Sequence, residues 1–281
     1  MAFQHSILAY DDPITTAVYH KIYLDIGNFL SSKAGRRAVI YSLEPNLKGE
    51  LLQQMIRNGV ANAAYHIRDS ALTIIDCDSF YRSSDRFCSQ TLANKLFSTV
   101  TELHNSYGYD NFLLYCRTEK LSEQYDFGHN IIFEQQLNSD FHSNVPKDRN
   151  HNTDKKTQNN NLSIEAICVY KKRFLEAQTL NELMKLLTYH TRVVHYQEMS
   201  RKALDGYKII ESIRRGFEEI LGEGSSRLLF ATLKLIYKID ENRIISDPDV
   251  FFEKLNKMIG RNAARIVNPS ISQHIISEVL Y

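Results

Sequence analysis

The sequence predicts an α/β fold, in which helices cover both faces of a mostly parallel sheet, followed by a small all-helical segment. Three observations lead to this prediction. Up to residue 198, short apolar runs alternate with segments of helical periodicity, which is the pattern of right-handed βαβ units. The runs LTIID and NFLLYC are almost continuously apolar, as in strands that are covered on both faces. After residue 198 the strand-like runs stop and only helical periodicity remains.

Six runs have the length and composition of strands. They cover residues 6–10, 37–43, 72–77, 111–117, 163–170 and 192–196. The first run ends in Tyr10 and is followed by Asp11, Asp12 and Pro13. An acid that precedes a proline in the first turn caps a helix and complements the positive end of its dipole. We therefore expect at least one of these acids to cap the next helix and to exclude phosphate from this turn.

Five segments between these strands have the apolar spacing of helices. They cover residues 14–30, 45–58, 90–106, 122–137 and 179–189. In the last segment, Thr179 is the expected N-cap and Glu182 follows three positions later, which is the signature of a capping box. Residues 142–161 break the alternation because they are polar and nearly free of apolar side chains. We predict a flexible surface insertion there, with His142 and His151 as solvated loop residues.

Residues 199–281 are expected to form a helical output or interaction domain. The apolar stripes that predict its helices cover residues 204–221, 228–237, 247–260 and 268–279. The third of these helices has Asp247 as its expected N-cap, Pro248 at its first position and Gly260 at its end. Residues 201–281 hold 13 Lys and Arg against 11 Asp and Glu, a net charge of +2. This charge is too small to indicate a nucleic-acid interface.

Composition and charge argue against several classes of protein. The net charge is +1, with 43% hydrophobic and 24% charged residues, so no general attraction to nucleic acid or anionic lipid is expected. The sequence shows no basic and apolar leader, and no apolar run long enough to span a membrane. No cysteines form a CxxC pair, and Cys116 and Cys168 lie in apolar strand runs, where a buried thiol behaves as a small hydrophobe. We therefore expect a cytoplasmic protein without structural zinc, other metal or cofactor.

The motifs of common catalytic sites are absent from the sequence. It contains no GxxxxGKS/T and no GxGxxG, which argues against ATP hydrolysis by a P-loop mechanism. It contains no GxSxG and no HExxH either. Cys77 lies between Asp76 and Asp78, whose charges disfavour the reactive thiolate. We therefore expect a protein that is not an enzyme.

A ligand-binding site is expected at one edge of the predicted sheet, because ligands of open parallel sheets bind at the carboxyl ends of the strands. The residues that we expect to contact a ligand there are Tyr10, Asp12, Glu44, Asp78, Arg117, Tyr170 and His190. Arg117 would anchor an anionic group, and Tyr10 and Tyr170 would form walls of the pocket. The alternative for each residue is a structural role, such as capping a helix or solvating a loop.

The order of the segments is similar to that of a known family. HSILAYDD, RRAVIYSLEPN, LTIIDCDSFY and NFLLYCRTEK are followed by a strand that ends in Tyr170, a basic turn, a helix and a final strand. The helix carries an LxxLLxxH pattern, formed by Leu183, Leu186, Leu187 and His190. Over residues 4–198 this order resembles the MEDS sensory domain of archaeal and bacterial signalling proteins. The resemblance implies a RecA/KaiC-like core that has lost its phosphate loop.

The resemblance also implies a function in signal transduction. LGEGSSRLLFATL and DPDVFFEKLNKMIG are similar to small output domains of archaeal regulators. We therefore expect a non-catalytic regulator, in which a sensor domain over 1–198 responds to an unknown small molecule or protein. The helical domain over 199–281 would bind a protein partner or associate with itself, and the signal would be a population shift. Membrane partners are not expected.

Two alternatives stay open at this point. The first is a transcription regulator whose helical domain binds DNA, although nucleic acid is not the expected partner. The second is a hydrolase that uses Mg²⁺ or Mn²⁺, since carboxylate clusters bind these ions. The acids available for such a cluster are Asp11, Asp12, Glu44, Asp76 and Asp78.

Overall fold

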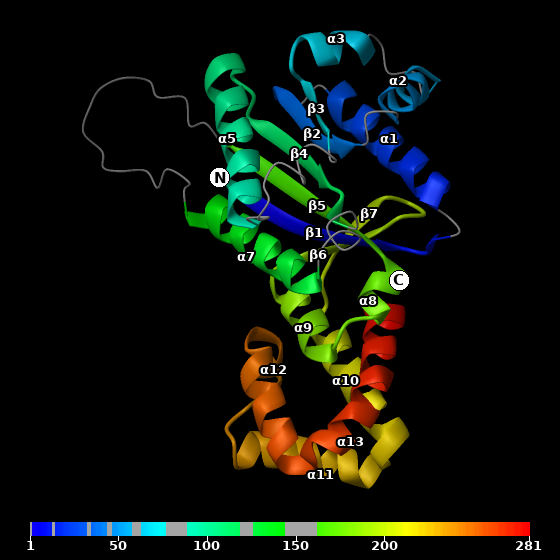
Figure 1. The fold of residues 1–281 in the computed structure, drawn as a ribbon, viewed down its shortest axis with the longest axis vertical. Coiled ribbons are helices and arrows are strands. Elements are labelled where there is room, and N and C mark those ends of the chain that lie inside the picture. The colour runs from blue at the N-terminus through cyan, green and yellow to red at the C-terminus, as the bar shows by residue number, and fades with distance from the viewer. Residues whose placement is uncertain are drawn as a thin grey trace, which may run out of the picture.

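The protein has a central seven-stranded sheet with the order β3-β2-β4-β5-β1-β6-β7 (Figure 1). The computed structural model describes residues 2–12, 15–32, 35–43, 47–57, 63–76, 89–118, 126–143 and 162–281. The strands are β1 Ala2–Tyr10, β2 Arg37–Leu43, β3 Leu72–Asp76, β4 Asn111–Cys116, β5 Ser163–Lys171, β6 Arg192–His195 and β7 Ser200–Ala203. Among these strands only β6 and β7 pair antiparallel. The predicted α/β fold with a mostly parallel sheet is therefore confirmed.

The middle of the sheet is formed by β1 and β5, which pair in parallel from Ala2↔Ser163 to Tyr10↔Lys171. Successive side chains of a strand point to opposite faces. Ile7 and Leu8 follow one another in β1 and are both fully buried, so both faces of the sheet are covered here. β7 was not predicted, because its sequence SRKA is polar and short, as suits a strand at the edge of a sheet.

The helices of this α/β part lie on both faces of the sheet (Figure 1). They are α1 Thr15–Ser31, α2 Lys48–Arg57, α3 Ala63–Arg68, α5 Ser89–Tyr107, α7 Phe127–Ser143, α8 Lys172–Glu176 and α9 Leu180–Thr188. α1 covers one face, where Asp25 of α1 accepts a hydrogen bond from Tyr115 of β4. α7 covers the other face, where Glu134 accepts a hydrogen bond from Tyr170 of β5.

Three differences from the predicted helices have physical reasons. α3 and α8 were not predicted, because they are only 6 and 5 residues long and show too little periodicity. α7 was predicted over residues 122–137 but extends to Ser143. His142 therefore belongs to a helix, where its ring packs edge-on against Phe3 at 5.1 Å between ring centroids. The prediction of a loop position for His142 is wrong, and residues 144–161 lie outside the described residues.

The predicted capping box at the start of α9 is confirmed. The Thr179 side chain accepts a hydrogen bond from the Glu182 backbone at 3.3 Å, and the Glu182 carboxylate accepts one from the Thr179 backbone at 3.0 Å. Leu183 and Leu187 on the inner side of α9 are buried. The cap therefore fixes the start of a helix whose apolar face belongs to the core.

The C-terminal segment consists of helices, as predicted. They are α10 Gly206–Leu221, α11 Glu223–Leu235, α12 Glu241–Ser246 and α13 Pro248–Val279. Asp247 caps α13, since its side chain accepts from the Val250 backbone at 3.4 Å, and Pro248 occupies the first turn. Gly260 has a positive φ of 78° and interrupts α13. Helix then continues directly, so the two helices predicted over residues 247–260 and 268–279 are two arms of one kinked element.

α10 and α13 pack closely against each other (Figure 1). A Cβ atom placed on Gly216 of α10 would lie only 2.7 Å from the Ile271 Cα atom of α13. Glycine thus allows the two backbones to approach. The buried apolar side chains of these helices, such as Phe217, join those of the sheet in one hydrophobic cluster. The C-terminal helices therefore share a core with the α/β part.

Two expectations from composition can be compared with the structure. Cys116 and Cys168 are buried and free, as expected for reduced thiols in strands, whereas Cys77 and Cys88 lie outside the described residues. Within the described ranges, no helix combines the length and apolar character that crossing a membrane requires.

Candidate functional site

The sheet separates the predicted ligand-binding residues. Tyr10 and Arg117 lie on the face covered by α1, where both approach Tyr19 of that helix. Tyr170 and His190 lie on the opposite face, beside Glu134 of α7. Glu44 and Asp78 were also predicted and lie outside the described residues. The structure therefore places four of the predicted residues in two pairs, one on each face of the sheet, while Asp12 lies beside Arg173 and Lys171 in the turn after β5.

On the α1 face, Arg117 is enclosed beneath Tyr19. Its side chain is only 2% exposed, and its guanidinium lies 4.5 Å from the centre of the Tyr19 ring and donates to the Tyr19 hydroxyl. The Arg117 backbone donates to the Ser42 hydroxyl at 2.9 Å. Tyr10 is fully buried nearby, with its ring centroid 6.5 Å from that of Tyr19. Arg117 is thus buried and already in contact with Tyr19, and its role as an anchor stays a prediction.

Asp11 and Asp12 pair with the basic turn that follows β5. Asp12 lies 2.9 Å from the Arg173 Nε and 3.6 Å from the Lys171 Nζ, and Asp11 lies 3.7 Å from the Lys172 Nζ. The helix cap predicted for these acids involves residues 13 and 14, which lie outside the described residues. Partly exposed ion pairs contribute little to stability. The three basic side chains nevertheless balance the negative charge of Asp11 and Asp12.

The described acids of the hydrolase alternative, Asp11, Asp12 and Asp76, are not gathered in one place, and Glu44 and Asp78 lie outside the described residues. Asp11 and Asp12 follow β1, whereas Asp76 ends β3 at the edge of the sheet. β2, β4 and β5 lie between these two strands. At about 4.8 Å per strand, this places them roughly 19 Å apart, too far for one metal ion to be shared.

The two arginines of α10 are paired with acids. Arg214 donates to Glu241 at 2.9 Å, and Arg215 donates to Glu278 at 3.0 Å. Paired charges release fewer counterions from DNA and contribute less to its binding. These contacts do not favour the alternative of a DNA-binding helical domain.

An ionic network that the sequence did not predict joins the sheet edge to α1. Arg201 of β7 donates to Asp25 of α1 and to Glu165 of β5, each at 2.7 Å. Tyr115 donates to the same Asp25 at 2.6 Å. Burial and the charge of Asp25 raise the pKa of Tyr115 well above its usual value, so this hydroxyl stays a donor. The network holds the edge strand to the first helix.

A second group, which we call the buried polar cluster, lies on the α7 face and consists of His5, Glu134, Cys168 and His190. Its members come from β1, α7, β5 and the turn after α9. None is more than 4% exposed. One nitrogen, oxygen or sulfur atom from each lies within 4.8 Å of the others. This concentration of titratable side chains in an apolar core is the most unusual chemistry in the described part of the chain.

Glu134 is at the centre of the buried polar cluster. Its Oε2 atom lies 2.9 Å from His5 Nε2 and 3.1 Å from the Cys168 sulfur. Its Oε1 atom accepts a hydrogen bond from Tyr170 at 2.5 Å. Burial raises the pKa of Glu134, but the charge of His190 and the hydrogen bond from His5 outweigh this effect and lower it to about 2. The carboxylate is therefore ionised inside the core.

Burial has the largest effect on the pKa of each of the two neighbouring groups, His190 and Cys168. Burial, followed by the proximity of His5, lowers the pKa of His190 to about 4, so this ring is neutral at pH 7. Burial and contact with Cys116 raise the pKa of Cys168 well above its usual value. Cys168 is therefore a protonated thiol at pH 7.

The orientation of the His190 ring leaves one nitrogen facing the cluster. Nδ1 lies 2.8 Å from the Leu186 carbonyl oxygen and so carries the proton that it donates. Nε2 then carries a lone pair and lies 3.8 Å from Glu134 Oε2. This nitrogen has no hydrogen-bond partner among the described residues, and neither has Nδ1 of His5. Buried polar atoms without partners are rare in folded proteins.

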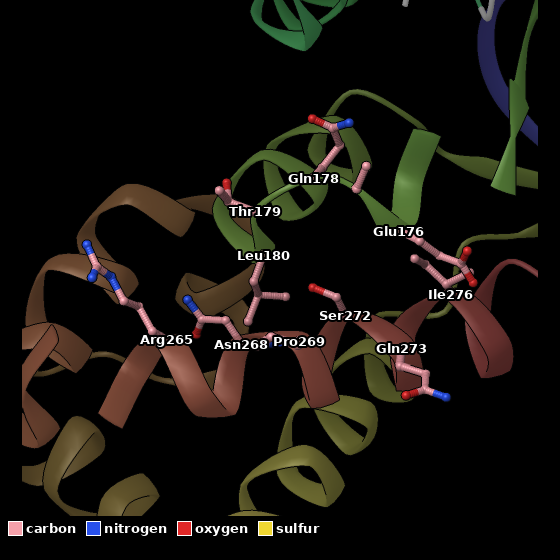
Figure 2. A pocket seen from close by; sticks show the side chains of 11 residues that line it. Glu176, Gln178, Thr179, Leu180, Arg265, Asn268, Pro269, Ser272, Gln273 and Ile276 are labelled. Carbon is pink, nitrogen blue, oxygen red and sulfur yellow. The ribbon is translucent and has the colours of Figure 1, made fainter. Parts of the chain in front are cut away.

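A groove of about 660 Å³ lies where the C-terminal helices meet the α/β part (Figure 2). One wall is the α8–α9 turn and the other is the second arm of α13. The lining residues are Glu176, Ala177, Gln178, Thr179, Leu180, Arg265, Asn268, Pro269, Ser272, Gln273 and Ile276. Five of these eleven residues carry an amide or hydroxyl side chain, although more of the lining surface is apolar than polar. Figure 2 shows Arg265 and Glu176 at opposite ends. The groove can therefore hold a small polar molecule.

Comparison with known proteins does not assign the chain to a family. No family model matches the chain, and a search of the curated proteins found no match. The fold and the sites define a mostly parallel α/β protein with attached helices, a buried polar cluster and a junction groove. The resemblance to the MEDS sensory domain stays a prediction.

Proposed function

We propose that this chain is a non-catalytic, cytoplasmic regulatory protein, in which a small ligand changes how the C-terminal helices dock on the α/β part. The groove between the α8–α9 turn and α13 is the observation that supports this proposal, because a molecule bound there contacts both parts at once. The MEDS resemblance is consistent with the same division into a sensing part and a responding part.

A polar contact outside the groove joins α9 to the first arm of α13. Asp249 in the first turn of α13 accepts from the Lys185 Nζ at 2.7 Å and from the Asn181 side chain at 3.0 Å. Both donors belong to α9. Lys185 and Asp249 are partly exposed, so the contact is weak enough to form and break. A ligand that fits only one arrangement of these helices would shift the population toward it.

The segment that forms the first wall of the groove connects two of the predicted ligand-binding residues, Tyr170 and His190, along the chain. β5 ends at Lys171, α8 starts at Lys172, and α9 leads to His190. A displacement of the α8–α9 turn therefore reaches Tyr170 and His190 through the chain itself. The α8–α9 segment would therefore transmit a change in the groove to the end of β5 and to the turn after α9.

The lining of the groove defines the class of ligand. Arg265 is exposed and can pair with an anionic group. Gln178 and Gln273 each supply an amide donor and acceptor. The Asn268 side-chain oxygen lies in the same lining and has no hydrogen-bond partner among the described residues. We expect a small polar metabolite with at least one negative charge.

A thermal-shift screen of small anionic metabolites tests the proposal. A ligand at 100 times its Kd should stabilise the protein by about 2.7 kcal/mol. Bound ligand should slow hydrogen exchange in the α8–α9 turn and in the second arm of α13. The double variant Gln178→Ala/Gln273→Ala should lose the shift. Gln53→Ala, the same change at an exposed position of α2, should keep it.

Two results would contradict the proposal. One is a ligand that protects only segments outside the groove. The other is a double variant that binds the ligand with unchanged affinity.

A further inference from the structure

We propose that the buried polar cluster is a structural metal site that binds one divalent transition metal ion, with zinc as the best fit. The ligand atoms are Nε2 of His5, Oε2 of Glu134, Sγ of Cys168 and Nε2 of His190. This inference goes beyond the proposed function, because it concerns the other end of α9 and no part of the groove.

The distances between these atoms match a tetrahedral zinc site. Zinc bonds of 2.0–2.3 Å place neighbouring ligand atoms about 3.3–3.6 Å apart. Nε2 of His5 lies 2.9 Å from Oε2 of Glu134 and 3.3 Å from the Cys168 sulfur. The Cys168 sulfur lies 3.1 Å from the same oxygen, and His190 lies 3.8 Å from it. These four distances differ from the tetrahedral values by about 0.5 Å or less, and the ligand atoms of all four residues lie within 4.8 Å of one another.

The donor set is also typical of zinc. Two imidazole nitrogens, one thiolate and one carboxylate combine borderline-soft and hard ligands. Calcium and magnesium prefer sites built only from oxygen atoms. Four protein ligands leave no open position, which distinguishes structural zinc sites from catalytic ones.

Groups outside the ligand set already hold two of the ligands in place. The Leu186 carbonyl fixes the proton of His190 on Nδ1, so that the lone pair of Nε2 faces the other ligands. Tyr170 holds Oε1 of Glu134 and leaves Oε2 toward the centre of the cluster. Metal-binding histidines and carboxylates are commonly supported in this way.

The unpartnered Nε2 of His190 is an independent indication of a cation. It faces Oε2 of Glu134 across 3.8 Å and has no hydrogen-bond partner among the described residues. Two lone pairs that face each other in a buried site repel one another, whereas a cation between them would bind both. No hydrogen bond among the described residues takes that place.

Charge and protons balance when the ion binds. Cys168 loses its proton to solvent, and His5 moves its proton from Nε2 to Nδ1. The carboxylate and the thiolate together then carry two negative charges, which neutralise a divalent ion. A neutral site suits full burial, because an uncompensated charge in the core is costly.

The site would join segments that are distant in the sequence. His5 and Cys168 are 163 positions apart and lie in neighbouring strands. Glu134 adds α7 from above the sheet, and His190 adds the turn after α9. The ion would thus fix the end of α9 nearest the sheet.

Metal analysis of the full chain tests the proposal. Protein produced in zinc-supplemented medium should contain about one zinc ion per chain after gel filtration. Protein unfolded with chelator and refolded with Co²⁺ should show the intense visible bands of a tetrahedral site and a thiolate-to-cobalt charge-transfer band. Cys168→Ser should lose the charge-transfer band.

Cys116→Ser is the matched control. Cys116 is buried and pairs with Cys168 across β4 and β5, but it is not a member of the buried polar cluster. This variant should keep one zinc ion and the charge-transfer band. Tyr170→Phe keeps all four ligands and should weaken zinc binding about ten- to hundredfold in a chelator competition.

The wild-type measurements decide the proposal even if Cys168→Ser does not fold. Substoichiometric zinc, together with a refolded cobalt sample that lacks tetrahedral bands, would overturn it. So would a Cys116→Ser variant that loses the charge-transfer band while Cys168→Ser keeps it, because another thiol would then be the ligand.

Discussion

Replacing Gly216 with alanine should force α10 and α13 apart. The new methyl carbon would lie 2.5 Å from Ile271 Cγ1, 2.7 Å from its Cα and 2.8 Å from its nitrogen. Two of these three atoms belong to the backbone, so rotation of the Ile271 side chain cannot relieve the contact. The methyl group would be about 0.7 Å too close for ordinary van der Waals contact.

The expected cost follows from two opposing effects. Overpacking of this kind destabilises a core by about 1–3 kcal/mol, and the backbone contacts place Gly216→Ala near the upper end. The gain in helix propensity of about 1 kcal/mol offsets part of it. We therefore expect a net loss of about 2 kcal/mol in the free energy of unfolding.

Urea denaturation followed by far-UV circular dichroism measures this loss as a lower midpoint with an unchanged slope. Gly224→Ala in α11 is the matched control, because nothing lies within 4 Å of the added Cβ. It should gain about 0.5 kcal/mol. A Gly216→Ala variant as stable as the wild type would show that the two helices are not in close backbone contact.

Three further predictions follow from contacts described above. Arg201→Met leaves the Asp25 carboxylate, which is 15% exposed, without its main partner, and should cost about 2–3 kcal/mol in urea denaturation; Arg201→Met/Asp25→Asn should recover part of this loss, and no recovery would contradict the pairing. Thr179→Ala removes the capping box and should lower stability by about 1 kcal/mol; an unchanged thermal midpoint would argue against the cap. Hydrogen bonding from Lys185 lowers the pKa of Asp249 below its usual value, so its contribution is present above the unfolded pKa and is lost as the pH falls through the folded one. Carboxyl NMR titration should show this pKa rising in Lys185→Met, and an equal pKa in both proteins would refute the contact.

Secondary structure was predictable in segments that are long enough to show a hydrophobic periodicity. The strand over residues 37–43 was predicted with its correct ends, because a mostly apolar run begins at Arg37 and the sequence continues with Glu44 and Pro45. β7 has four residues and two of them are charged, so neither length nor periodicity distinguishes it from a loop. Its place is determined by pairing with β6 and by Arg201, and both are tertiary contacts.

The sites were less predictable than the fold, because they depend on strand order. The rule that ligands bind at strand ends selects an edge of the sheet but not a face. Tyr10 and Tyr170 were therefore predicted together, although they lie on opposite faces. The four residues of the buried polar cluster do not form a recognisable motif, because they are far apart in the sequence. The sequence indicates them only in that His5 and Cys168 lie within largely apolar strands. Their proximity follows only once β1 and β5 are neighbours.

The position of β1 in the middle of the sheet has a consequence for biosynthesis. A ribosome makes this strand before either of its neighbours, β5 and β6. β2, β3 and β4 can pair with one another much earlier, since β2 contacts both of the others. In the nascent chain, β1 therefore stays without its sheet neighbours until β5 has been made. The chain from Tyr10 to Ser163, which is more than half of the protein, is translated in that time. Long-range strand pairing of this kind slows folding and exposes the chain to aggregation, so newly made molecules should depend on chaperones more than the finished fold suggests.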